Sequence, residues 1–330
     1  MHGTLAAGTG VTGAAQLLTV QVADVRAEAC DVMTLELRAI GAGQLPPFDP
    51  GAHIDVHLPN GLLRHYSLTN DWRERDRYVI GVGRAADSRG GSAFVHGSVR
   101  AGMQLKISAP KNNFPIDSAA ERYLFIAGGI GITPIMAMIR WCVAQEKPWR
   151  LIYAVRSRQR AAFYEQLSKL AKASAQFHFD DEQGEVMDVA RAAASWASGE
   201  RIYCCGPTPL MEAVKSATQH LPGDTVRFEF FTAPEPDPDQ TSDSFSVRLE
   251  RSGAEFVVPA DKSILEVLEE NGIEVPFSCR EGLCGTCVTP VCSGEPDHRD
   301  YVLTDEERAS GKLMTICCSR SKSSSLTLDL

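Results

Sequence analysis

Four cysteines in the last third of the chain have a spacing that suits iron–sulfur chemistry. Cys279, Cys284 and Cys287 form a C-x4-C-x2-C pattern, and 29 residues separate Cys287 from Cys317. Plant-type [2Fe–2S] clusters are held by four thiolates at this spacing. A zinc site or a set of structural cysteines is the weaker alternative, because zinc sites usually combine C-x2-C pairs or histidines. The pattern therefore predicts a cluster that carries one electron at a time.

The fourth ligand has two adjacent candidates, Cys317 and Cys318, and the spacing favours Cys317. Gly282 and Gly285 lie inside the loop and allow its backbone N–H groups to turn toward sulfur. The remaining cysteines are expected to be small buried apolar residues, which is the usual role of a free cysteine.

Two short motifs in the first third could bind a flavin. Arg64, Tyr66 and Ser67 place a cation, an aromatic ring and a hydroxyl together, and Arg64 would stabilise the negative charge that a flavin gains on reduction. The second motif, at a predicted helix start, offers backbone donors for a phosphate: Arg89, Gly90, Gly91 and Ser92. Taken alone, each motif is a weak signal, because the first is often a half-buried strand and the second a surface turn.

A glycine-rich turn in the middle third could bind a dinucleotide. Gly128, Gly129 and Gly131 follow an apolar run, and a tight turn of this kind lets a pyrophosphate approach backbone donors at a helix start. The next residues, Thr133-Pro134, predict an N-cap and the first helical position. Pro134 stands where the last glycine of G-x-G-x-x-G would be, so the fingerprint is incomplete.

The choice between NADH and NADPH depends on the residues that meet the adenosine ribose. Arg156, Arg158 and Arg160 follow the second predicted strand of this region. Arginine suits the additional phosphate of NADPH, so NADPH is not excluded, although these side chains could simply face water.

Three regions with different sequence patterns are expected to form the elements that position these residues. Residues 17–116 contain short alternating strands separated by turns, which predict a small antiparallel β-barrel. Residues 117–233 alternate strands with helices and predict a doubly wound α/β domain. Residues 244–330 begin with a hairpin and a capped helix and resemble a β-grasp fold. A flexible leader (1–16) and a proline-rich acidic linker (234–243) complete the prediction.

The composition sets the class of protein. The chain has 330 residues, 44% of them hydrophobic, and a formal net charge of −9, which disfavours binding to nucleic acid. No apolar run is long enough to span a membrane, and thiols at cluster spacing without a signal peptide favour the cytoplasm. A monomer is expected.

Taken in order, the motifs resemble the phthalate dioxygenase reductase family. They are Arg64-x-Tyr66-Ser67, Ser88-Arg89-Gly90-Gly91-Ser92, Gly128 to Pro134, Cys205-Gly206-Pro207 and the C-terminal cysteines. The resemblance covers Leu17 to Leu330 and implies a multidomain fold: an FMN-binding antiparallel β-barrel, a ferredoxin-reductase-like NAD domain and a C-terminal β-grasp ferredoxin. One departure concerns a strand that ends in Lys-Arg in the family. Here it is Gly81-Val82-Gly83-Arg84, so Gly83 replaces a lysine contact.

The resemblance also implies roles for individual residues. The flavin ring would contact Arg64, Tyr66 and Ser67, and the FMN phosphate would contact Arg89 to Ser92. The strand along the ribityl chain would contribute Gly81, Val82 and Gly83, and Phe231 would lie near the flavin. Cys205 would lie near the nicotinamide, with the rest of the nucleotide held by Gly128, Gly129, Gly131, Thr133, Arg156, Gly206 and Pro207.

The activity implied by the resemblance is NADH-dependent electron transfer through FMN and a [2Fe–2S] cluster to a Rieske-type terminal oxygenase in aromatic hydrocarbon catabolism. Two alternatives stay open. A reductase for a cytochrome or a diiron hydroxylase more often carries its ferredoxin at the N-terminus. A redox sensor would have a dispensable flavin site, contrary to the intact motifs at Arg64 and Arg89.

Overall fold

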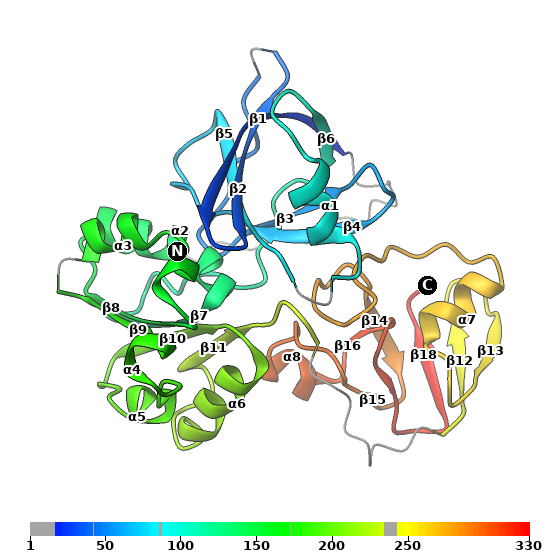
Figure 1. Cartoon of the computed structure of the whole chain (residues 1–330). Coiled ribbons are helices and arrows are strands. Elements are labelled where there is room, and N and C mark those ends of the chain that lie inside the picture. Colours follow the sequence, from blue (N-terminus) through cyan, green and yellow to red (C-terminus); the bar gives the residue numbers. More distant parts are fainter. Residues whose placement is uncertain (1–16, 42, 86–87, 172, 234–242) are drawn as a thin grey trace, which may run out of the picture.

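The computed structural model describes residues 17–41, 43–85, 88–171, 173–233 and 243–330, arranged as three large sheets with separate hydrophobic cores and one additional two-stranded sheet (Figure 1). The predicted leader and all of the predicted linker except Asp243 lie outside the described residues. The multidomain fold class predicted from the sequence is confirmed.

The first sheet is an antiparallel barrel with the order β4-β3-β6-β1-β2-β5. A bridge between Leu68 and Ile80 joins the segments at its two edges. Alternating residues such as Val20 and Val22 point into the core, as the sequence predicts. The elements are β1 (Leu18–Ala29), β2 (Val32–Ala39), β3 (His53–His57), β4 (Leu63–Ser67), β5 (Arg77–Gly83), α1 (Gly91–Ser98) and β6 (Gln104–Ile107).

The second sheet is parallel, with the order β11-β10-β7-β8-β9 and helices on both faces. Its strands are β7 (Arg122–Gly128), β8 (Trp149–Val155), β9 (Ala175–Phe179), β10 (Glu200–Cys205) and β11 (Val226–Glu229). Its helices are α2 (Ile132–Ala144), α3 (Tyr164–Ala171), α4 (Asp180–Gln183), α5 (Val189–Ala193) and α6 (Thr208–Ala217), with 3-10 turns η1 (Gly129–Gly131) and η2 (Arg158–Arg160).

The third sheet is mixed, with the order β13-β12-β18-β14-β16. Ser263 and Glu266 form a capping box at the start of α7, as predicted. The elements are β12 (Phe245–Leu249), β13 (Glu255–Val258), α7 (Ile264–Glu270), β14 (Val288–Ser293), β15 (Pro296–Asp297), α8 (Asp305–Ser310), β16 (Leu313–Thr315), β17 (Arg320–Ser321) and β18 (Ser325–Leu328).

The three parts surround a common centre. In Figure 1 the barrel lies at the top, the parallel sheet at the lower left and the third sheet at the lower right. None of the described helices is both long enough and apolar enough to cross a bilayer.

Candidate functional site

The two motifs of the barrel form one unit around Arg64 on β4. Arg64 Nη2 donates a hydrogen bond to the carbonyl of Arg89, at 2.9 Å. The Arg64 side chain lies against Gly91 so closely that a Cβ there would overlap it. Gly90 has φ +86° and precedes α1, so the motif stands at a helix start, as predicted. Glycine is therefore required at both positions.

A cavity of about 570 Å³ lies where the three parts meet. Six residues predicted from the sequence line it, namely Arg64, Ser67, Arg89, Phe231, Cys279 and Cys284. His53, Asn113, Glu229, Phe230 and Tyr301 also line it. One cavity therefore brings the barrel motifs, the end of the parallel sheet and the cysteine loop together.

Seven predicted barrel residues do not line this cavity, namely Tyr66, Gly81, Val82, Gly83, Gly90, Gly91 and Ser92. Tyr66 packs against the barrel core, and burial raises its pKa to about 12. Val82 is buried, and its carbonyl lies 3.0 Å from His96 Nε2. Gly81 and Gly83 instead approach the parallel-sheet domain, where Cβ atoms would lie 2.8 Å from Thr133 Cγ2 and 3.3 Å from Ile130 Cγ1, respectively.

The two segments predicted to bind the nucleotide, Gly128–Thr133 and Cys205–Pro207, pack on each other. A Cβ at Gly128 would lie 2.6 Å from Pro207 Cδ, and one at Gly131 would overlap the carbonyl of Cys205. Both segments follow the carboxyl ends of neighbouring parallel strands, β7 and β10, which is where such sheets bind their ligands.

Thr133 is not the N-cap of α2, so that prediction is wrong. The helix begins at Ile132, and its N-cap is Gly131, which makes no side-chain cap hydrogen bond. The 3-10 turn η1 continues into α2 without a break, so the helix starts before Thr133. Thr133 is buried, and its Oγ1 donates to the carbonyl of Ile130, at 2.9 Å.

Glu229 is a cavity residue that the sequence analysis missed. It is paired with Cys205 in the register of β10 and β11. Its Oε2 is buried without a hydrogen-bond partner, and burial raises the pKa of the carboxyl to about 8. Cys205 itself is buried, and burial raises the pKa of its thiol well above the usual value. The available signal was a carboxylate at the end of the last strand, two residues before Phe231.

Two of the three arginines that follow β8 form ion pairs with acidic residues. Arg158 donates to both carboxylate oxygens of Glu182, at 2.9 and 3.0 Å. Arg160 forms an ion pair with Asp31 of the barrel, at 2.9 Å. Arg156 is exposed, and its side chain makes no ion pair within the described ranges. Of the three, only Arg156 is available for a nucleotide phosphate.

The cysteine loop gathers the four predicted thiols. Contacts with Cys284 and Cys317 lower the pKa of Cys279, and a contact with Cys317 likewise lowers the pKa of Cys287. The N–H groups of Glu281 and Leu283 donate to Cys279 Sγ, at 3.3 and 3.4 Å. Gly282 and Gly285 both have φ +70°, as their predicted role requires. Cys318 turns toward Thr315, with Sγ 3.2 Å from Oγ1.

The cysteine loop is held against the barrel by polar contacts. Asn113 Nδ2 donates to the carbonyl of Cys284, at 3.1 Å, and Lys111 Nζ donates to Thr286 Oγ1, at 3.2 Å. Arg89 and Glu281 form an ion pair. These contacts join the segment after β6 and the Arg89–Ser92 motif directly to the cysteine loop at residues 279–287.

The residues that line the cavity and form the cysteine loop are suited to hold the bound groups predicted from the sequence, a flavin and an iron–sulfur cluster. Two buried polar atoms, His53 Nε2 and Glu229 Oε2, have no hydrogen-bond partner and belong to residues that line the cavity. Such atoms are costly unless a bound group satisfies them. Four clustered thiols with backbone N–H groups directed at sulfur suit an iron–sulfur cluster.

Comparisons with known proteins agree with this geometry. Residues 125–216 match the family described as oxidoreductase NAD-binding domain, and residues 247–322 match the 2Fe-2S iron-sulfur cluster binding domain. The chain is 46% identical over 302 residues to the phenoxybenzoate dioxygenase subunit beta of Ectopseudomonas oleovorans, covering 91% of this chain and 93% of that protein.

Two solved structures are similar over 95% of the chain. The first is phthalate dioxygenase reductase, described as a modular structure for electron transfer from pyridine nucleotides to [2Fe-2S], at 40% identity and a TM-score of 0.69, with 98% of that chain covered. The second is an intact type IV self-sufficient cytochrome P450 monooxygenase, at 38% identity and a TM-score of 0.90, of which this chain covers 41%.

Proposed function

Because the chain belongs to the phthalate dioxygenase reductase family, we propose that its three units form one electron path centred on the 570 Å³ cavity. The chain is an NAD-dependent oxidoreductase with a 2Fe-2S domain. The proposed units are 17–116 for FMN, 117–233 for NADH and 244–330 for the cluster, with a leader at 1–16 and a linker at 234–243. When bound, NADH would be the hydride donor, FMN would supply two-electron acceptance with one-electron release, and the [2Fe–2S] cluster would supply one-electron transfer.

On the barrel side, the proposed flavin contacts are Arg64, Tyr66 and Ser67. Arg64 keeps its guanidinium at the cavity through its bond to the carbonyl of Arg89, where a fixed positive charge favours a reduced, anionic ring. Arg89, Gly90, Gly91 and Ser92 would hold the phosphate at the start of α1, because the first backbone N–H groups of a helix have no partner within the helix and the N-cap Gly90 supplies no side chain to bond them. Gly81, Val82 and Gly83 remain proposed neighbours of the ribityl chain through their backbone alone.

On the nucleotide side, the proposed contacts lie on η1 and the Cys205–Pro207 turn, which follow the carboxyl ends of β7 and β10. Gly128, Gly129, Gly131 and Thr133 would position the pyrophosphate, with Arg156 toward the ribose. Cys205, Gly206, Pro207 and Phe231 would border the nicotinamide and the flavin. We add Glu229, because a carboxyl that is neutral near pH 7 can lie beside a nicotinamide ring without repelling a hydride.

We propose NADH as the preferred nucleotide. Two of the three candidate arginines are already paired with Glu182 and Asp31, and freeing them would break these ion pairs. The acidic α4, at the end of β9, would also repel a 2′-phosphate. These observations favour a ribose without the additional phosphate.

The proposed cluster ligands are Cys279, Cys284, Cys287 and Cys317. Cys317 is favoured over Cys318 because it contacts Cys279 and Cys287. Cys279 and Cys284 line the same cavity as Arg64 and Ser67, so two of the proposed cluster ligands would lie beside the proposed flavin site.

The chain works with an oxygenase, as the names of its relatives indicate. We propose a Rieske-type terminal oxygenase in aromatic hydrocarbon catabolism, reached from a monomeric reductase in the cytoplasm. One observation favours a second acceptor, a cytochrome P450: the same three-part fold forms part of a self-sufficient P450 monooxygenase.

The observation that carries the proposal is the single cavity bordered by Arg64, Glu229 and Cys279 of the three units. The purified protein should contain stoichiometric FMN together with a [2Fe–2S] cluster, and NADH should reduce a ferric acceptor through it. Mixing with a Rieske oxygenase and, separately, with a P450 then identifies the acceptor that is reduced. Protein with a cluster and no flavin would contradict the assignment of the barrel.

A further inference from the structure

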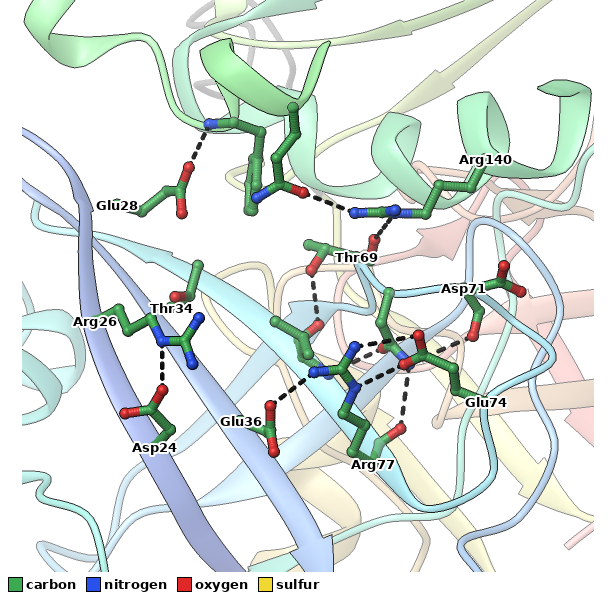
Figure 2. Close-up of a pocket in the computed structure, with 14 residues that line it drawn as sticks. Asp24, Arg26, Glu28, Thr34, Glu36, Thr69, Asp71, Glu74, Arg77 and Arg140 are labelled. Atoms are coloured by element: carbon green, nitrogen blue, oxygen red, sulfur yellow. Dashed lines mark hydrogen bonds and ion pairs between the residues drawn. The ribbon is translucent and has the colours of Figure 1, made fainter. Parts of the chain in front are cut away.

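A second cavity, of about 220 Å³, lies between the barrel and the parallel-sheet domain. Figure 2 shows charged side chains around it, most of them from β1, β2 and the segment between β4 and β5. The parallel-sheet domain contributes Arg140, Phe163 and Gln166. This cavity shares no lining residue with the 570 Å³ cavity, and none of the residues proposed to contact the flavin, the nucleotide or the cluster lines it.

Most charges around this cavity are neutralised within the barrel. Glu74 receives hydrogen bonds from Arg77, and Asp71 receives them from Arg73. Arg140, in contrast, forms no ion pair with any described carboxylate within 4 Å. It is therefore a cation held by directional hydrogen bonds to neutral groups.

Arg140 joins three segments. It comes from α2, and its Nε donates to the carbonyl of Thr69 in the barrel, at 3.1 Å. Its Nη2 donates to Gln166 Oε1 on α3, at 2.8 Å. Figure 2 shows both bonds along the same guanidinium. Its planar, forked geometry fixes direction in a way that an ammonium group cannot.

The hydrogen bond from Arg140 to Thr69 is one of two nearby contacts between α2 and the barrel. Thr69 lies two residues after Ser67, and both its backbone N–H and its Oγ1 donate to the carbonyl of Val79 on β5, at 2.8 and 3.0 Å. Two residues further along β5, Gly81 approaches Thr133 in the first turn of α2. Thr133 and Arg140 both lie on α2. The two contacts therefore join the barrel segments near the proposed flavin site to the helix that follows the glycine-rich turn at 128–131.

We propose that Arg140 is a positioning residue that fixes the orientation of the NADH domain relative to the FMN barrel, and thereby the alignment for hydride transfer. This inference rests on the proposed function of the two domains. Hydride transfer is sensitive to small errors in distance, since a misplacement of about 1 Å can reduce a rate about a hundredfold. A second barrel contact, from the N–H of Phe163 to Glu28 Oε1 at 2.8 Å, leaves the interface assembled when Arg140 is changed.

The experiment compares Arg140→Gln with Arg140→Lys in the cofactor-loaded protein. Rapid mixing with saturating NADH should show flavin reduction slowed about tenfold or more in Arg140→Gln, with the dissociation constant for NADH changed less than threefold. Arg140→Lys should recover part of the rate. Reduction of the cluster by the flavin should be unchanged, because the cysteine loop docks on another side of the barrel.

A readout independent of activity is hydrogen–deuterium exchange. The peptides containing Thr69–Val79 and the last turns of α2 should exchange faster in Arg140→Gln than in wild type. Arg75→Gln is the matched control, since Arg75 Nε donates to the carbonyl of Leu45 within the barrel alone. The control should leave both the hydride-transfer rate and the exchange of α2 unchanged.

Unchanged flavin reduction and unchanged exchange in Arg140→Gln would overturn the inference while leaving the proposed function intact. Failure of NADH to reduce the wild-type flavin would instead overturn the proposed function. If Arg140→Gln does not fold, Gln166→Met decides the question, because it removes the other partner of the guanidinium. A hydride-transfer rate equal to wild type in Gln166→Met would then overturn the inference.

Discussion

At the scale of single residues, the charge of Glu229 depends on its burial beside the 570 Å³ cavity. Burial raises the pKa of this carboxyl from 4.5 to about 8, so the folded protein keeps a proton that the unfolded chain loses above about pH 4.5. The folded state therefore binds more protons between these pH values. Its stability contribution falls as pH rises from about 4.5 through 8.

Glu229→Gln should remove this pH dependence. Without the titrating carboxyl, the free energy of unfolding should decline less between pH 5 and pH 8, with a difference from wild type on the order of 2 kcal/mol at pH 8. Urea unfolding at several pH values measures it. Glu185→Gln, at an exposed position, is the control. An identical pH profile in Glu229→Gln and wild type would show that the carboxyl is not held neutral.

The adjacent cysteines give a second prediction at this scale. Cys317→Ser should lose the visible absorbance and the iron of the cluster, because Cys317 is the thiol in contact with Cys279 and Cys287. Cys318→Ser should keep both, since Cys318 turns toward Thr315. Iron analysis and absorbance spectra of the two variants are compared directly. Loss of the cluster in Cys318→Ser alone would reverse the assignment.

At the scale of elements, the segment after β6 holds the cysteine loop against the barrel. Asn113→Ala removes a hydrogen bond to the carbonyl of Cys284, a loss of about 1 kcal/mol, and should slow electron transfer from flavin to cluster about two- to fivefold. Flavin reduction by NADH should not change. Asn112→Ala is a matched control, since the hydrogen bonds of Asn112 to described residues all lie within the barrel. Equal slowing in both variants would mean that the effect is a general loosening of the segment.

The turn after β8 and helix α4 should control nucleotide preference. Wild type should use NADH with a kcat/KM at least about tenfold above that for NADPH, because charge repulsion and engaged arginines oppose the additional phosphate. Glu182→Gln frees Arg158 and should raise kcat/KM for NADPH while leaving that for NADH nearly constant. Steady-state kinetics with both nucleotides, and Glu185→Gln as control, measure this. A preference for NADPH in wild type would contradict the account.

The sequence pattern within each segment was sufficient to predict most of the helices and strands. The capping box at Ser263 and the glycines at 282 and 285 depend on nearby residues, and the structure has them as predicted. The N-cap at Thr133 failed because η1 runs into α2, a continuity that a Thr-Pro pair does not reveal.

Contacts between units could not be predicted from such patterns. Glu229 meets Cys205 only through the parallel register of β10 and β11. Arg140 meets Thr69 across 71 positions, and Asn113 meets Cys284 across 171. These pairings depend on how separately folded sheets dock, which single-segment periodicity does not contain.

At the scale of the whole molecule, the three units border one cavity, so the proposed path requires no rearrangement between donor and acceptor sites. The barrel contacts each of the other two units through a separate polar interface, one at Arg140 and one at the cysteine loop. Because these two interfaces are separate, we expect that different variants slow the reduction of the flavin and the reduction of the cluster.

The most direct measurement is anaerobic rapid mixing of the purified protein with NADH, followed by absorbance at flavin and cluster wavelengths and by low-temperature EPR of frozen samples. We expect flavin absorbance to bleach first and the rhombic signal of a reduced [2Fe–2S] cluster to grow afterwards at a slower, distinct rate. A cluster signal that grows without prior bleaching of a bound flavin would contradict the central claim.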